Sequence, residues 1–161
     1  MPIRVGVLTV SDSGAAGQRD DRSGDTIEGW VRDSGFELAG RDLVPDETDM
    51  IAQLLMRWAD EGVADVILTT GGTGFSPRDV TPEATRAVLE REAPGVAEAI
   101  RSSSRETVPR SMLSRGVAGI RNATLIVNLP GSVGGVRDGI ATIAPVLEHA
   151  VQILRDEPTD H

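Results

Sequence analysis

The chain has 161 residues and a formal net charge of −9 at pH 7, and it contains no cysteine. This length suits one domain with a sizeable core, and the acidic balance argues against nucleic acid as a partner. The lack of cysteine excludes disulfides, thiolate catalysis and zinc–sulfur sites, and it fits the cytoplasmic location that we expect.

The first half of the chain alternates between predicted strands and helices. The first strand is an apolar, Val-rich run. In the second strand apolar and polar residues alternate, so that strand is expected nearer the sheet edge. Ser23 or Asp25 is expected to cap the first helix, which Gly35 ends, and Thr48 or Asp49 is expected to cap the second. Strands are predicted over residues 3–10, 36–44 and 64–70, and helices over residues 26–34 and 48–59.

The second half continues with helices and a predicted hairpin, whose turn is Asn122-Ala123. Ser132 opens the last helical region, which Pro145 is expected to interrupt or restart near residue 146. We expect one α/β domain over residues 1–155 and a flexible tail over residues 156–161. Helices are predicted over residues 81–92, 95–105 and 132–154, and strands over residues 117–121 and 124–129.

The alternation of strands and helices predicts a three-layer α/β/α fold with a mostly parallel central sheet. Ligands of such sheets bind outside the carboxyl ends of the strands. Four polar segments are expected to converge on that rim, which makes it the candidate site. They are Ser11–Ser13, Asp46, Gly71–Asp79 and Asn128–Ser132.

The most informative segment is residues 69–85, which reads TTGGTGFSPRDVTPEAT. A buried strand leads into a glycine turn, a polar loop and a helix start, an arrangement that presents backbone N–H groups to an anion. Glycines after a strand more often form only a tight turn. The adjacent cation and carboxylate of Arg78 and Asp79 favour an anion site over that simpler interpretation.

The charged residues of the rim each have a simpler structural interpretation. Asp79 can complement a helix dipole or hold Mg²⁺ against ligand phosphates, and Arg78 can be a solvated charge or a phosphate clamp. Asp46 follows a proline, and by sequence alone an Asx turn or a helix cap is favoured over a metal-ligand role. For Asp12 a turn and a ligand role are about equally supported.

The residue types limit the chemistry that is available. With no cysteine, and with His149 expected to be structural, covalent and histidine-based catalysis are poorly supported. All 16 basic residues are arginine, which excludes a Walker-A loop, a Schiff base and a protein-kinase fold. Positioning, a metal ion and electrostatics remain, and these suit phosphoryl or nucleotidyl transfer. No apolar run is long enough to span a membrane, and the first residues do not resemble a signal peptide.

Four ordered motifs resemble the molybdopterin-binding family of molybdenum cofactor biosynthesis, which includes molybdopterin adenylyltransferases. The likeness covers nearly the whole chain, and four motifs in order are highly specific. The segment over residues 69–85 resembles the family signature. The other motifs are VLTVSDS at residues 7–13, LVPDE at 43–47, LSRGVAG at 113–119 and NLPGS at 128–132.

The resemblance implies a homotrimer that binds molybdopterin, a pterin with a dithiolene and a terminal phosphate. In the adenylyltransferases of the family, ATP and Mg²⁺ convert molybdopterin to adenylyl-molybdopterin and pyrophosphate, and the product then passes to molybdate insertion. The family's essential aspartates fall on Asp46 and Asp79, which by analogy handle Mg²⁺ and the transferring phosphate. The implied ligand-binding residues are Ser11, Asp12, Gly71, Gly72, Thr73, Gly74, Arg78, Pro130, Gly131 and Ser132.

One departure from the family pattern concerns the pterin side of the site. Members commonly continue the Pro-Gly-Ser motif with a proline and a basic residue, where this chain has Val133 and Gly134. Either Arg137 supplies the missing cation, or the contact with the phosphate of the pterin is weaker. Two alternatives stay open: a carrier trimer that binds molybdopterin without adenylation, and an unrelated sugar-phosphate or nucleotide enzyme.

Overall fold

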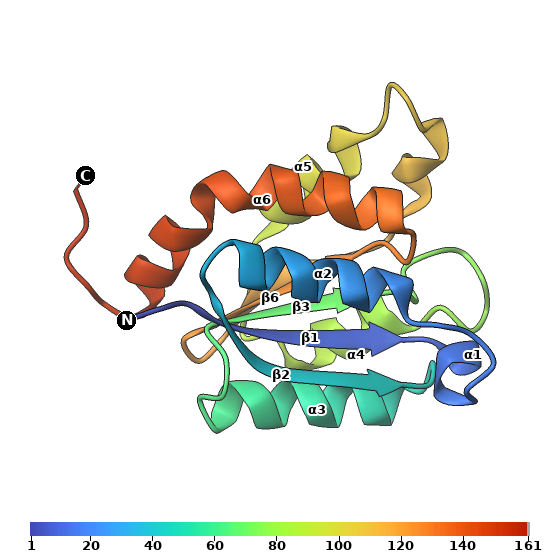
Figure 1. Ribbon diagram of the computed structural model, residues 1–161, viewed down its shortest axis with the longest axis horizontal. Helices are drawn as coiled ribbons and strands as arrows, with labels where there is room; N and C mark the ends of the chain where they lie inside the picture. The colour runs from blue at the N-terminus through green and yellow to red at the C-terminus, as the bar shows by residue number, and fades with distance from the viewer. Residues whose placement is uncertain (161) are drawn as a thin grey trace.

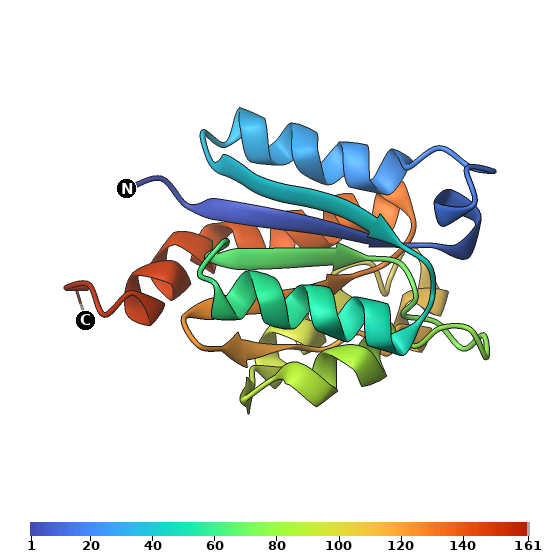
Figure 2. The same ribbon diagram turned by 90° about the horizontal axis from the view of Figure 1, so that it is seen from below.

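A central sheet lies between two layers of helices in the computed structural model, which describes residues 1–160 (Figures 1 and 2). The strand order is β2-β1-β3-β6-β5-β4; the first four strands are parallel, and β5 and β4 extend the sheet in antiparallel fashion. The predicted three-layer fold is therefore confirmed. The strands are β1 (Arg4–Val10), β2 (Glu37–Val44), β3 (Val66–Thr70), β4 (Arg91–Glu92), β5 (Ala118–Arg121) and β6 (Thr124–Leu129).

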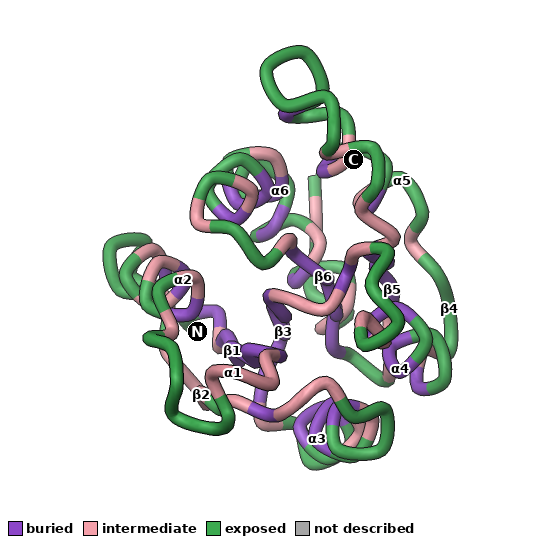
Figure 3. Tube along the Cα trace, turned by 90° about the vertical axis from the view of Figure 1, so that its right-hand side faces the viewer, coloured by how far each residue is buried: buried purple, intermediate pink, exposed green. Residues whose placement is uncertain are grey.

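Alternating side chains divide the core into two clusters, one on each face of the sheet. Val5 and Val7 of β1 belong to the cluster under α2, α5 and α6, whereas Leu8 and Val10 belong to the cluster under α3 and α4. Figure 3 looks along the sheet and shows α2 and α6 on one side and α3 on the other. The helices are α1 (Asp12–Ala15), α2 (Arg22–Asp33), α3 (Thr48–Asp60), α4 (Thr81–Val88), α5 (Pro94–Ser103), the 3₁₀ helix η1 (Pro109–Leu113) and α6 (Val133–Leu154).

The sequence patterns locate most of these elements correctly. β2 lies at the sheet edge, as its alternating pattern predicts. The β5–β6 hairpin forms where expected, with Asn122 in the left-handed conformation (φ 50°) that its turn requires. The short helices α1 and η1 were not predicted, because each is a single turn or little more within a polar connection.

Both predicted helix caps in the first half were wrong. Helix α2 begins earlier than predicted, and its cap is Asp21, whose carboxylate accepts the Gly24 N–H at 3.0 Å. Asp21 also accepts from Thr9 and Arg41, so tertiary contacts fix its place. Helix α3 has Glu47 at its N-cap position and no side-chain cap hydrogen bond.

The predicted helix over residues 81–92 ends early, at Val88. Residues 91–92 instead form β4, and the chain before them bonds to the sheet through the Glu90 N–H, which donates to the Ile120 carbonyl at 2.9 Å. The open edge of β5 therefore overrides the local helical pattern, because pairing satisfies backbone groups that the edge otherwise exposes.

Helix α6 continues through Pro145, where an interruption was expected. Its buried residues include Ile143 before the proline and Leu147 after it. Packing of both halves on the sheet holds the helix together, and its last turns change direction (Figure 1). The proposed domain boundary after residue 155 stays a prediction, and the predicted tail includes His161, which lies outside the described residues.

No helix in residues 1–160 is long and apolar enough to cross a membrane.

Asp65 anchors the end of the sheet that is remote from the candidate site. Its carboxylate accepts hydrogen bonds from Arg4 and Arg155, and the Arg155 guanidinium also donates to the backbone of Met1 and Pro2. Burial alone raises the pKa of Asp65, but the hydrogen bonds from Arg4 and Arg155 outweigh it and lower the pKa from 3.8 to about 2. The ionised carboxylate therefore stabilises the fold.

Replacing Asp65 by Asn is expected to reduce the free energy of unfolding at pH 7 by about 2 kcal/mol. Because the folded pKa is depressed, this contribution is present above pH 3.8 and is lost as the pH falls through about 2. Urea unfolding at pH 7 and at lower pH measures this contribution. Asp60→Asn is the control, since the exposed Asp60–Arg121 pair is screened by solvent and contributes little to stability. Equal losses in the two variants at pH 7 would contradict the prediction.

Candidate active site

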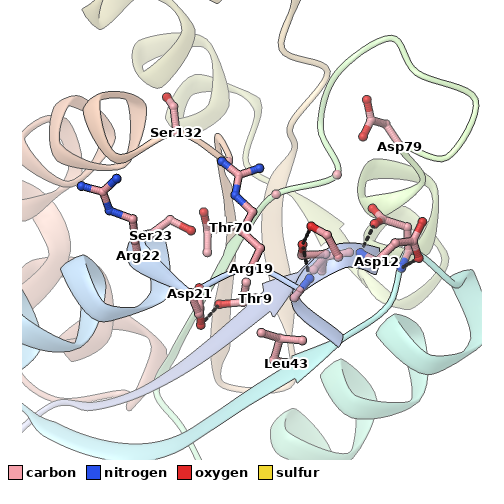
Figure 4. A pocket seen from close by; sticks show the side chains of 18 of the residues that line it. Thr9, Asp12, Arg19, Asp21, Arg22, Ser23, Leu43, Thr70, Asp79 and Ser132 are labelled. Atoms are coloured by element: carbon pink, nitrogen blue, oxygen red, sulfur yellow. Dashed lines mark hydrogen bonds between the residues drawn. The ribbon is translucent and has the colours of Figure 1, made fainter. Parts of the chain in front are cut away.

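The parallel strands end at one edge of the sheet, and the segments that follow them line a cleft of about 730 Å³, here called cleft A. Figure 4 shows Asp12 and Asp79 on one side of it and Arg22, Ser23 and Ser132 on the other. The expected convergence of four loops is therefore observed. The predicted site residues that line cleft A are Ser11, Asp12, Asp46, Gly71, Gly72, Arg78, Asp79, Gly131 and Ser132.

The remaining predicted residues line a second cleft of about 750 Å³, here called cleft B. Thr73, Gly74 and Pro130 belong to it. Its other walls come from α5, η1 and the start of α6, and they are more apolar than those of cleft A. The two clefts share four residues and therefore meet along one line, formed by Gly72, Asp79, Gly131 and Ser132.

The turn after β3 can be built only from glycine. Gly71 and Gly72 have φ values of 97° and 69°. A Cβ on Gly71 would lie 2.3 Å from the Val10 carbonyl oxygen, and one on Gly72 would lie 2.3 Å from Thr81 Oγ1. Both the left-handed backbone and the lack of space exclude a side chain. Gly131 approaches the same turn, since its Cβ would lie 3.3 Å from the Gly71 Cα.

Thr81 closes this turn at the start of α4. Its hydroxyl donates to the Gly71 carbonyl at 2.9 Å, and its N–H donates to the Gly72 carbonyl at 3.1 Å. Ser132 has a different role at α6, where its hydroxyl accepts from the Gly135 N–H at 3.0 Å and caps the helix. The last helical region therefore opens at Ser132, as predicted.

Asp46 and Asp12 hold one another across the cleft floor. The Asp12 N–H donates to Asp46 Oδ2 and the Asp46 N–H donates to Asp12 Oδ1, both at 2.9 Å. The pKa of Asp46 is raised, mainly because the carboxyl group is partly buried. The hydrogen bond from the Asp12 N–H lowers this pKa, whereas the negative charges of Asp12 and Asp79 raise it. Asp46 is thus a carboxylate in a site that favours an added positive charge.

Arg78 lines cleft A but already has acidic partners. Its guanidinium donates to both carboxylate oxygens of Asp12, at 3.0 and 2.9 Å, and to Glu47 at 2.9 Å. This hydrogen bonding lowers the pKa of Asp12. In this arrangement Arg78 ties its loop to the floor of the cleft.

Asp79 sits where the two clefts meet. Its Oδ2 accepts the Ser76 N–H at 3.0 Å and lies 2.8 Å from where a Gly74 Cβ would be, so Gly74 makes room for the carboxylate. Within residues 1–160 no group of three or more His, Cys, Asp or Glu side chains is placed to hold a metal ion. The set of two carboxylates is nonetheless typical of Mg²⁺ sites, where substrate phosphates and waters complete the coordination.

Sequence reasoning missed several arginines of the site. Arg19 and Arg22 line cleft A from the loop before α2 and the start of that helix (Figure 4). Their position in the polar segment after the first strand was the available signal. Arg115 donates from its guanidinium to the Gly74 carbonyl in the loop over residues 73–79, and it was quoted only as part of a motif. Arg137, the suggested replacement cation, is not among the residues that line either cleft, whereas Arg110 lines cleft B.

The fold and the two clefts define an α/β protein with a glycine turn and two carboxylates at the carboxyl ends of its parallel strands. Residues 6–149 match the family model described as "Probable molybdopterin binding domain". The chain belongs to this family, and the resemblance drawn from its motifs is confirmed.

Relatives of known name support the assignment. A molybdopterin adenylyltransferase of Helicobacter pylori (strain J99) is 38% identical over 155 residues, which cover 94% of this chain and 88% of the relative. A crystal structure of the molybdopterin biosynthesis enzyme MoaB from Thermus thermophilus is 49% identical, with a TM-score of 0.91 over 98% of this chain and 99% of that one. The Drosophila melanogaster molybdenum cofactor synthesis protein cinnamon is 44% identical over 96% of this chain, but the chain spans only 26% of its length.

Proposed function

We propose that this protein transfers AMP from ATP to molybdopterin in a Mg²⁺-dependent reaction, giving adenylyl-molybdopterin and pyrophosphate. The observation that carries the proposal is the meeting of the two clefts at Asp79 and Ser132. Two substrates, one in each cleft, can bring their phosphates together there. Relatives named molybdopterin adenylyltransferase match most of the chain, which supports the same activity.

Each cleft suits one substrate. Cleft A is lined by Ser11, Arg19 and Arg22, whose hydroxyl and guanidinium groups can bind the phosphates of a nucleoside triphosphate. Cleft B is more apolar and carries Arg110, which suits a flat pterin with a terminal phosphate. Because the whole chain carries a charge of −9, attraction of these anions must come from such local groups.

The reaction requires that a phosphate oxygen of molybdopterin attack the α-phosphorus of ATP. A new P–O bond forms, the bond between the α- and β-phosphates breaks, and pyrophosphate leaves. Asp46 and Asp79 fit a Mg²⁺ site, because both line cleft A and the negative charge of Asp79 raises the pKa of Asp46. Mg²⁺ bound there would neutralise the charge of the phosphates. The glycine turn and the start of α6 supply backbone N–H groups that orient them.

The test is adenylyl transfer by the purified protein with molybdopterin, ATP and Mg²⁺, in which adenylyl-molybdopterin and pyrophosphate are followed over time. We expect both products in equal amounts, and none when EDTA replaces Mg²⁺. Tight molybdopterin binding without ATP consumption would favour the carrier function, to which Val133 and Gly134 draw attention. Failure to bind any pterin would favour an unrelated nucleotide or sugar-phosphate enzyme.

Two further expectations belong to this proposal. We expect a homotrimer, which sedimentation of the purified protein measures directly. We also expect a cytoplasmic protein that hands its product to a molybdate-inserting enzyme.

A further inference from the structure

The loop that carries Asp79 has little apolar packing to hold it. We call residues 73–79 the glycine loop. Its tip is exposed: the Phe75 side chain is 69% exposed, and residues 76–78 are exposed as well. A segment without buried apolar contacts opens easily unless hydrogen bonds hold it closed. The position of Asp79 therefore depends on which groups bond to this loop.

Three hydrogen bonds from one residue fasten the loop from outside. The Arg115 N–H donates to the Thr73 carbonyl at 2.8 Å. Its guanidinium donates to the Gly74 carbonyl at 2.8 Å and to the Asp79 carbonyl at 2.7 Å, and it also pairs with Glu83 of α4. Arg115 thus bonds to both ends of the loop and to the helix that follows it.

The guanidinium is suited to this task. Its donors lie in one rigid plane, so that one side chain reaches two carbonyl groups and a carboxylate at fixed angles. A lysine would keep the charge near Glu83 but would offer only one nitrogen, on a flexible stem. The Arg115 side chain is 33% exposed, which keeps these bonds partly out of water.

We propose that Arg115 is a positioning residue that holds the glycine loop so that Asp79 faces the line where the two clefts meet. It acts through the backbone, because its bond goes to the Asp79 carbonyl while the Asp79 carboxylate accepts from Ser76. The proposal rests on the proposed function only for its kinetic consequence; the placement of the loop is testable without any substrate.

Hydrogen exchange of the unliganded full chain tests the placement. The Ser76 and Asp79 amides are the probes, since they are bonded within the loop, to Asp79 Oδ2 and to the Ser76 carbonyl. We expect Arg115→Ala to speed their exchange about tenfold or more, and Arg115→Lys to do nearly the same.

Arg121→Ala is the matched control. Arg121 is the last residue of β5 and has a similar pattern of contacts, with both oxygens of Asp60 and with the Val88 carbonyl, at the end of the sheet remote from the site. We expect it to lower the stability of the fold and to leave the Ser76 and Asp79 amides unchanged. A general loss of stability is thereby separated from a local effect on the loop.

The kinetic test asks whether each substitution changes kcat or KM in adenylyl transfer. We expect Arg115→Ala and Arg115→Lys to lower kcat by about 10- to 100-fold and to raise the Mg²⁺ concentration for half-maximal rate, with the KM for ATP little changed. Arg121→Ala is expected to keep the wild-type values at a temperature where it is folded.

Unchanged exchange of the Ser76 and Asp79 amides in Arg115→Ala would overturn the proposal, as would full activity of Arg115→Lys at wild-type Mg²⁺ concentrations. If the wild-type protein transfers no AMP, the proposed function fails, and the exchange measurement still decides whether Arg115 positions the loop.

Discussion

Asp79→Asn is expected to reduce kcat for adenylyl transfer by about 100-fold or more, the loss typical when a group that stabilises transition-state charge is removed. The substitution keeps the shape of the side chain, and the Asn oxygen can still accept the Ser76 N–H, so the loop should keep its conformation. What is lost is the negative charge that would hold Mg²⁺ at the line where the two clefts meet.

Initial rates over a Mg²⁺ titration, with thermal unfolding of the same samples, measure this effect. We expect Asp46→Asn to act in the same direction, because its carboxylate shares cleft A with Asp79. Asp60→Asn removes a carboxylate at the far end of α3, where it pairs with Arg121, and should keep full activity. Wild-type turnover in either Asp79→Asn or Asp46→Asn would rule out the metal–carboxylate mechanism.

Local pattern was sufficient for the order of the longer elements because each buried face has a period that the sequence displays. The strand over residues 3–10 and the apolar face of α3 are examples: Ile51, Leu54, Leu55 and Trp58 are all buried. The failures have tertiary causes. Residues 91–92 join the sheet because β5 offers an open edge, and helix α2 is capped by Asp21, which Arg41 holds in place.

The rim of the site was predictable for a different reason. In a parallel sheet the segments after the strands must meet, so the topology alone brings Asp46 and Asp79 to one cleft. What each polar group bonds to was not predictable. Arg78 bonds to Asp12 and Glu47, and Arg115 reaches Gly74 across 41 positions of sequence. Contacts over such separations depend on packing that no local pattern displays.

Gly71→Ala is expected to damage both the fold and the site. With φ at 97°, the backbone of Gly71 is strained for any other residue, and the added Cβ would lie 2.3 Å from the Val10 carbonyl oxygen, which is fixed in β1. We expect the free energy of unfolding to fall by at least about 2 kcal/mol. Because relief of the clash must move the turn away from β1, the glycine loop should shift and adenylyl transfer should be lost.

Gly17→Ala separates the two causes of that loss. Gly17 also has a left-handed backbone, with φ at 71°, but a Cβ there would meet nothing within 4 Å. Gly17→Ala is therefore expected to lower the free energy of unfolding by the conformational strain alone, about 1 kcal/mol, and to retain activity. Denaturant unfolding gives the free energy of unfolding of both variants. The difference between the two losses is the part caused by the clash of the turn with Val10. If the two variants lose the same stability and Gly71→Ala stays active, the turn has room to relax, and the glycine is required only for its backbone conformation.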